Sequence, residues 1–297
     1  MSTSVMYTER THPVSTNSLV RGLAVIGFVA LIVFPGLLSA QAPAGGGRGG
    51  GGRGAQAPAQ TFKRLSDGKP DMQGYFETAN FFTAFDVETH EKAEFGVPAG
   101  RGVIVDPADG KIPYQPWALE KKKDLSAHHL FEDPQAHCYL SGVPRQMYTP
   151  FGFQILQPKG SVVLLYEAFH SYRIIPLDGR PHIPDAIRLF EGDSRGHWEG
   201  DTLVVDVTNQ NPGTWFDMAA NFHSDALHVV ERFTMKDSRT IDYKATIDDV
   251  KVFTRPWTIE FNLVRNRDAD YEQMEYACVE GEKDLQHYTT GEGGKAK

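Results

Sequence analysis

Apolar and polar residues alternate strictly along two stretches of the C-terminal half of the chain. From Ile241 to Asp248 and again from Trp257 to Leu263, every second side chain is apolar and its neighbours are polar or charged. Successive side chains of a β-strand point to opposite faces, so this period of two predicts strands with one apolar and one polar face. Such strands are typical of an antiparallel sheet that packs one face on a core.

Further strand-like runs precede these two, and turn residues such as Pro158-Lys159-Gly160 and Asp178-Gly179 separate them. The aromatic-rich segment Gln73–Phe85 is predicted to be either a first strand or an arm packed over the sheet. The other predicted strands are Phe153–Gln157, Ser161–Glu167, Tyr172–Leu177, Gly196–Trp198, Thr202–Thr208, Leu227–Met235, Thr240–Asp248, Trp257–Val264 and Gln273–Val279.

Short strands with short turns and almost no helix between them predict a mainly β fold. We expect an antiparallel up-and-down meander that closes into a lipocalin-like barrel, because closure removes exposed strand edges. A β-sandwich is the alternative. The segment Trp117–His129 is rich in residues of high helix propensity and is predicted to form one short surface helix.

The N-terminal sixty residues do not resemble the rest of the chain. An uncharged apolar run, Gly22–Phe34, follows Arg10 and Arg21 and precedes Leu38-Ser39-Ala40. A basic region, a short apolar region and a small residue predict a secretory signal peptide over residues 1–40, cleaved after Ala40. An uncleaved anchor is the alternative, because the run approaches the length of about 20 residues that spans a bilayer. Export to the periplasm or the extracellular space is therefore expected, without stable membrane insertion after cleavage.

Residues 41–60 consist mostly of Gly, Ala, Pro, Gln and Arg, and lack the apolar bulk needed to offset the entropy of ordering. They are predicted to be a disordered tether, followed by a single β-barrel domain at 61–288 and a disordered tail at 289–297. The formal net charge is −8 at pH 7, which argues against a nucleic-acid partner. The two cysteines, Cys138 and Cys278, are compatible with one disulfide in an oxidising compartment, and two buried free thiols are the alternative.

The clean alternation fails in the strand Leu227–Met235. The face that carries Leu227, Val229 and Phe233 also carries Glu231. A buried carboxylate needs a partner, and without one its pKa rises, so Glu231 is a candidate site residue. Pairing with Arg173 or Arg232 in a purely structural role is the alternative.

Other candidate residues lie near strand ends and in one long loop. Glu167 ends a strand, where functional residues concentrate. The loop from Asn209 to Phe222 carries Trp215, whose ring could stack on a flat ligand, and leads to His223 and His228. None of the 11 histidines has a spacing that is specific for a metal, so no metal and no cofactor is predicted.

Several segments resemble a large family of exported bacterial β-rich proteins for which no activity is established. The most specific are WEGDTLVV, at Trp198–Val205, and ALHVVERF, at Ala226–Phe233. The resemblance covers nearly all of residues 67–284, although DGKPDMQGYF, at 67–76, ends in Tyr-Phe where the family usually has Trp. It implies export, and it makes the positions of the two cysteines look like a family feature, which favours a disulfide.

The sequence is compatible with two functions of different class, and it does not decide whether the protein is an enzyme. The first is binding of a small apolar or aromatic molecule in or at the mouth of the barrel; its candidate contact residues are Tyr166, Arg173, Trp198, Trp215, Asp217 and Arg232. The second is an acid–base enzyme (a lyase, isomerase or hydrolase); its candidate bases are Glu231 and Glu167, its acids His223 and His228, and its anion anchors Arg232 and Arg173. A structural envelope protein with a packed barrel is a third possibility.

Overall fold

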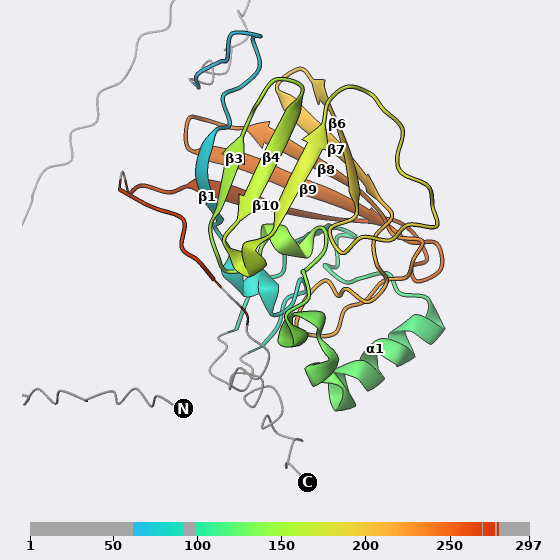
Figure 1. Ribbon diagram of the computed structural model, residues 1–297. Helices are drawn as coiled ribbons and strands as arrows, with labels where there is room; N and C mark the ends of the chain where they lie inside the picture. Colours follow the sequence, from blue (N-terminus) through green and yellow to red (C-terminus); the bar gives the residue numbers. More distant parts are fainter. Residues whose placement is uncertain (1–61, 92–98, 269, 277, 279–297) are drawn as a thin grey trace, which may run out of the picture. The chain divides into compact units, whose positions relative to one another are not determined.

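The alternating stretches form strands with the expected faces in the computed structural model, which describes residues 62–91, 99–268, 270–276 and 278 (Figure 1). Strands β9 (Thr240–Asp248) and β10 (Trp257–Arg265) bury nearly every second residue. The predicted signal peptide, tether and C-terminal tail lie outside the described residues. Among the residues that are described, no helix is long and apolar enough to cross a bilayer.

Ten antiparallel strands form one sheet, in the order β5-β4-β3-β1-β10-β9-β8-β7-β6, with β2 paired to β10 beside this path. The fold class is confirmed: the structure is mainly β, its antiparallel sheet curls into a nearly closed barrel, and the described residues contain one α-helix, α1 (Pro116–His128). The remaining strands are β1 (Gly74–Thr78), β2 (Ile104–Asp106), β3 (Phe153–Leu156), β4 (Ser161–Tyr166), β5 (Tyr172–Pro176), β6 (Asp193–Glu199), β7 (Thr202–Thr208) and β8 (His228–Met235). Short 3-10 helices are η1 (Phe81–Ala84), η3 (Leu130–Glu132), η4 (Pro134–His137), η5 (Arg145–Met147) and η6 (Ala168–His170).

Two runs of sequential strands are joined by β1, which lies between β3 and β10. The aromatic-rich segment after Gln73 is thus a strand of the sheet. The predicted strand Gln73–Phe85 is shorter than expected, and η1 follows it.

The prediction of a strand at Gln273–Val279 is wrong for residues 273–276, which have no regular secondary structure. Strand β10 already has a neighbour on each side, β1 and β9, so the chain that follows has no free edge of β10 to join. It runs instead beside β4, where Gln273 Nε2 donates to the Leu165 carbonyl oxygen at 3.0 Å. The disulfide between Cys138 and Cys278, with Cα atoms 5.4 Å apart, confirms the predicted pairing and attaches this segment to the loop before η5.

The seam of the barrel lies between β5 and β6, the two ends of the strand order. A Cβ on Gly196 of β6 would lie 2.7 Å from Ile175 Cγ2 of β5, so glycine allows the two strands to pack closely. Arg173 Nη2 of β5 also donates to Ser194 Oγ of β6 at 3.1 Å. Side chains therefore hold the seam together.

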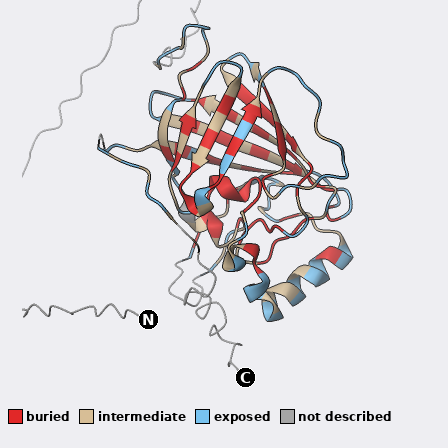
Figure 2. Ribbon diagram, in the orientation of Figure 1, coloured by how far each residue is buried: buried red, intermediate tan, exposed pale blue. Residues whose placement is uncertain are grey.

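The two ends of the barrel differ. At one end, tight turns join β3 to β4, β6 to β7 and β8 to β9. At the other, which we call the loop end, the strands are covered by long connections, whose described parts are 79–91, 99–152, 209–227 and 249–256 (Figure 1). The inner faces of the strands are buried, as the alternating red bands in Figure 2 show. Large side chains fill this interior, including Phe76, Phe153, Leu164, Phe233 and Tyr243. Because loops carry function more often than strands do, the loop end is the place to look for a site.

Candidate functional site

Glu231 lies inside the barrel, as the alternation of its strand predicts. Its carboxylate is fully buried, whereas His228 and Arg232 point to the outer face of β8. Arg173 donates Nη1 to Glu231 Oε1 at 3.2 Å and Nη2 to Oε2. The Tyr243 hydroxyl donates to Oε1 at 2.8 Å. Glu231 therefore has charged and neutral donors, which supports the structural alternative for this residue.

Arg173 connects this pair to neighbouring polar groups, which together form what we call the inner cluster: Tyr166, Arg173, Glu191, Ser194, Glu231 and Tyr243. The Tyr166 hydroxyl lies 3.4 Å from Arg173 Nη1 and 3.3 Å from Met147 Sδ. Burial raises the pKa of both Tyr166 and Tyr243. Both phenols are therefore protonated at neutral pH and act as donors.

Glu191 is the member of the inner cluster that lacks hydrogen bonds. It is 8 % exposed, and neither carboxylate oxygen has a hydrogen-bond partner. Burial raises its pKa from 4.5 to about 7, although the positive charge of Arg173 opposes the rise. Buried polar groups are almost always paired, so an unpaired carboxylate at the loop end is unusual. Sequence reasoning missed Glu191, because it lies in a connection without periodicity and no motif marks it.

The loop from Asn209 to Phe222 is fixed by Asp217 rather than open to a ligand. Asp217 is fully buried and accepts N–H bonds from Val87 at 2.9 Å, Ala219 at 3.0 Å and Asn221 at 3.2 Å. Burial and the neighbouring Asp86 raise its pKa. Trp215 is 8 % exposed and belongs to the hydrophobic core. The structure thus places both residues in the support of the loop end.

His223 and His228 have different surroundings, since His223 is buried in the connection before β8 and His228 lies on the outer face of that strand. His223 is buried, with Nδ1 2.8 Å from the Ser224 carbonyl oxygen and Nε2 2.7 Å from Thr214 Oγ1. Burial lowers its pKa, so the ring is neutral at pH 7. The partners of His223 differ from those of Glu231, so the structure does not pair the two residues as an acid and a base.

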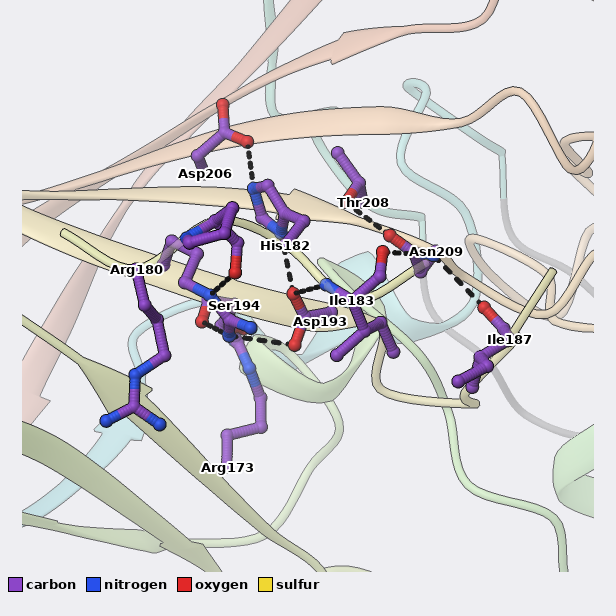
Figure 3. A network of polar contacts seen from close by, with 12 residues as sticks. Arg173, Arg180, His182, Ile183, Ile187, Asp193, Ser194, Asp206, Thr208 and Asn209 are labelled. Carbon is purple, nitrogen blue, oxygen red and sulfur yellow. Dashed lines mark hydrogen bonds and ion pairs between the residues drawn. The ribbon is translucent and has the colours of Figure 1, made fainter. Parts of the chain in front are cut away.

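On the outer face, His228 belongs to a chain of alternating carboxylates and imidazoles that we call the outer relay: Asp193, His182, Asp206 and His228. His228 Nε2 lies 2.7 Å from Asp206 Oδ2, and His182 Nε2 lies 2.8 Å from Asp206 Oδ1. His182 Nδ1 lies 2.7 Å from Asp193 Oδ2 (Figure 3). The hydrogen bond with Asp206 raises the pKa of His228, and the same bond lowers the pKa of Asp206.

Two predicted contact residues lie away from the loop end. Arg232 Nη2 donates to Glu199 Oε2 at 2.7 Å on the outer face. Trp198 lies beside the tight turn between β6 and β7, and Lys69 Nζ is 5.6 Å from its ring centroid. The partners of Arg232 and Trp198 in these contacts, Glu199 and Lys69, do not belong to the inner cluster.

A groove of about 560 Å³ opens at the loop end, beside the start of β5. Tyr172 and Met274 on its walls are 63 % and 68 % exposed. The other lining residues are Leu165, Tyr166, His170, Ser171, Gln273 and Glu275. Glu167, at the end of β4, is buried and accepts a hydrogen bond from the Tyr271 hydroxyl at 2.9 Å, which steadies the segment that forms one wall. Of the predicted contact residues, Tyr166 lines this groove.

Among the residues that the structure describes, no three His, Cys, Asp or Glu side chains are arranged to hold a metal ion. A comparison with models of known protein families found no match, and a search of curated proteins found no similar sequence.

Proposed function

We propose that the protein is exported and binds a small aromatic or apolar molecule in the groove at the loop end. The exposed faces of Tyr172 and Met274 across this groove carry the proposal. Its volume of about 560 Å³ is within the range of small-molecule sites. Thioether and aromatic side chains adapt to flat apolar ligands, and His170, Ser171 and Gln273 supply polar groups that orient a ligand. The packed interior of the barrel favours this external groove over the lumen.

Export is supported by the disulfide, since such bonds persist in oxidising compartments. The family resemblance and the N-terminal pattern point the same way. N-terminal sequencing of the mature protein should begin at Gln41.

A fluorescent naphthylamine probe tests the groove. Saturable binding is expected, and Tyr172→Ser should weaken it by about fivefold or more, because stacking on an aromatic ring contributes about 1 kcal/mol beyond area burial. Trp117→Ser is the matched control, because Trp117 is also an exposed aromatic residue (50 %) but lies on α1. Absence of saturable binding at micromolar protein, or equal losses in the two variants, would remove the proposal.

The unpaired carboxylate of Glu191 favours a second candidate, an acid–base enzyme. A carboxyl group with a pKa near 7 can both donate and accept a proton at neutral pH. Its neighbour Arg173 could stabilise a negative charge that develops on a substrate. In this candidate Glu191 takes the role that the sequence suggested for Glu231 or Glu167.

Glu191→Gln tests this second candidate through stability and activity. A raised pKa in the folded state stabilises the fold below pH 4.5, and this contribution is lost as the pH rises through about 7. Over that interval the wild type should lose about 3 kcal/mol more unfolding free energy than the variant, in which Asp217 still contributes a loss of the same sign. Any substrate that the wild type turns over should react at least about a hundredfold more slowly with the variant. Identical pH profiles of stability would show that Glu191 ionises normally, and would count against the candidate.

A further inference from the structure

The connection 177–192 joins β5 to β6, two strands that run in the same direction. Strand β5 begins at the loop end, where Tyr172 faces Leu165, and β6 also begins there, where Asp193 faces Thr208. The connection therefore returns along the barrel from the turn end to the loop end. It ends beside the seam and carries Glu191. The attachment of this connection to the sheet therefore affects how closely β5 and β6 pack at the seam, and it positions the Glu191 carboxylate.

Of the contacts that attach this connection to the sheet, two side-chain anchors differ in chemistry (Figure 3). The first is His182, between Asp193 and Asp206. The second is Asn209, whose Nδ2 donates to the carbonyl oxygens of Pro184 and Ile187, each at 3.1 Å. An amide has no charge to lose, so the second anchor does not respond to pH, whereas the first contains three titratable groups.

A proton count shows what the His182 anchor requires. Both ring nitrogens lie within 2.8 Å of carboxylate oxygens, Nδ1 at 2.7 Å from Asp193 and Nε2 at 2.8 Å from Asp206. An ionised carboxylate only accepts hydrogen bonds, and a neutral imidazole has a single N–H. A neutral ring would therefore direct one lone pair at a carboxylate. Two good hydrogen bonds need a doubly protonated, positively charged ring.

The geometry points to a pH-operated latch: protonated His182 fastens the connection 177–192 to the sheet through Asp193 and Asp206, and loss of its proton loosens the part of the connection around His182, which the Ile183 N–H and Arg195 then hold alone.

Charged groups from four strands face the His182 anchor or its partners. From β6, Asp193 faces Nδ1, and Arg195 Nη1 binds the other oxygen of Asp193 at 2.8 Å. From β7, Asp206 faces Nε2, and from β8, His228 binds the second Asp206 oxygen. Asp248 of β9 is paired with His228 in the sheet register and favours the charge on that ring. Arg195 Nε also donates to the Pro181 carbonyl oxygen at 3.0 Å, so it retains part of the connection when the latch opens.

The direction of the pH dependence follows from these contacts. His228 has a raised pKa, so its ion pair with Asp206 is complete below the ordinary histidine value of about 6.5 and is lost as the pH rises above it. Asp206 has a lowered pKa, so it stays ionised to more acidic pH than a free carboxyl group. Because the two hydrogen bonds of His182 need a protonated ring, the latch is closed in acidic solution and opens as the pH rises. Release would loosen the seam beside the inner cluster.

Hydrogen exchange measured on the full mature protein tests the latch. Protection factors of peptides from 177–192, corrected for intrinsic exchange, should fall roughly tenfold between about pH 6 and about pH 9, while peptides from β9 and β10 stay constant. His182→Gln should show the low protection at both pH values. Asn209→Ala is the matched control: it should lower protection by the same factor at both values, because its anchor has no titratable group.

Equal protection of 177–192 in the wild type at the two pH values would overturn the latch, whether or not a variant folds. It would also be overturned if His182→Gln kept the wild-type pH dependence. Retention of that dependence in Asn209→Ala, with its loss in His182→Gln, would establish it.

Discussion

Replacing Arg173 by methionine should destabilise the fold by about 3–5 kcal/mol, among the largest effects of any single substitution in this protein. Arg173 is 3 % exposed and supplies two of the three hydrogen bonds to the Glu231 carboxylate. Without it, a fully buried carboxylate retains only the Tyr243 hydroxyl as a donor. The cost is the penalty of an uncompensated charge rather than the net strength of the ion pair. Urea unfolding measures it as a lower midpoint.

Two further variants separate this explanation from a general loss of packing. Arg173→Met combined with Glu231→Leu should recover most of the lost stability, because a buried ion pair can be replaced by apolar groups of similar volume at little cost. Arg232→Met is the matched surface control, since Arg232 pairs with the exposed Glu199 and its loss should cost less than about 1 kcal/mol. If the double variant were less stable than Arg173→Met alone, desolvation of Glu231 would not be the cause.

The sequence predicted that Glu231 is inside the barrel, because one period of alternation assigns a face to every residue of β8. It suggested Arg173 as one of two partners without deciding between them. The choice depends on contacts across the barrel, since β5 and β8 are not neighbours in the sheet. Strand registers of several intervening pairs determine which side chains meet inside, and a pattern along one strand does not contain that information.

Two residues on which the proposals depend lie in a segment without alternation of apolar and polar positions. Glu191 and His182 both belong to the connection 177–192, for which the sequence predicts only turns. Their importance arises from tertiary surroundings: burial in one case, and two carboxylates from neighbouring strands in the other. Conversely, Trp215 and Asp217 have residue types suited to ligand binding, but burial places them in the support of the loop end. Residue type suggests chemistry, and exposure decides whether the chemistry is available.

The disulfide should make the second large contribution to stability. Cys138 and Cys278 are separated by 140 positions, and the loop that they close contains every strand from β3 to β10. Closing so long a loop restricts the unfolded chain, which on the chain-entropy model stabilises the fold by up to about 5 kcal/mol. The double variant Cys138→Ser/Cys278→Ser should therefore lose about 2–5 kcal/mol of unfolding free energy. Urea unfolding of the variant and of the reduced wild type should give the same midpoint.

The same variant should weaken probe binding at the loop end. The segment with Met274 forms one wall of the groove and is held by the disulfide and by the Gln273–Leu165 hydrogen bond. Without the disulfide, that wall depends on weak contacts and pays an ordering cost when a ligand binds. Tyr271→Phe in the oxidised protein is the control, because Tyr271 does not line the groove and the change removes only its hydrogen bond to Glu167, so it should have the smaller effect on affinity. Unchanged affinity in the cysteine variant would mean that the segment is held in place without the disulfide, and that the disulfide acts on the unfolded chain alone.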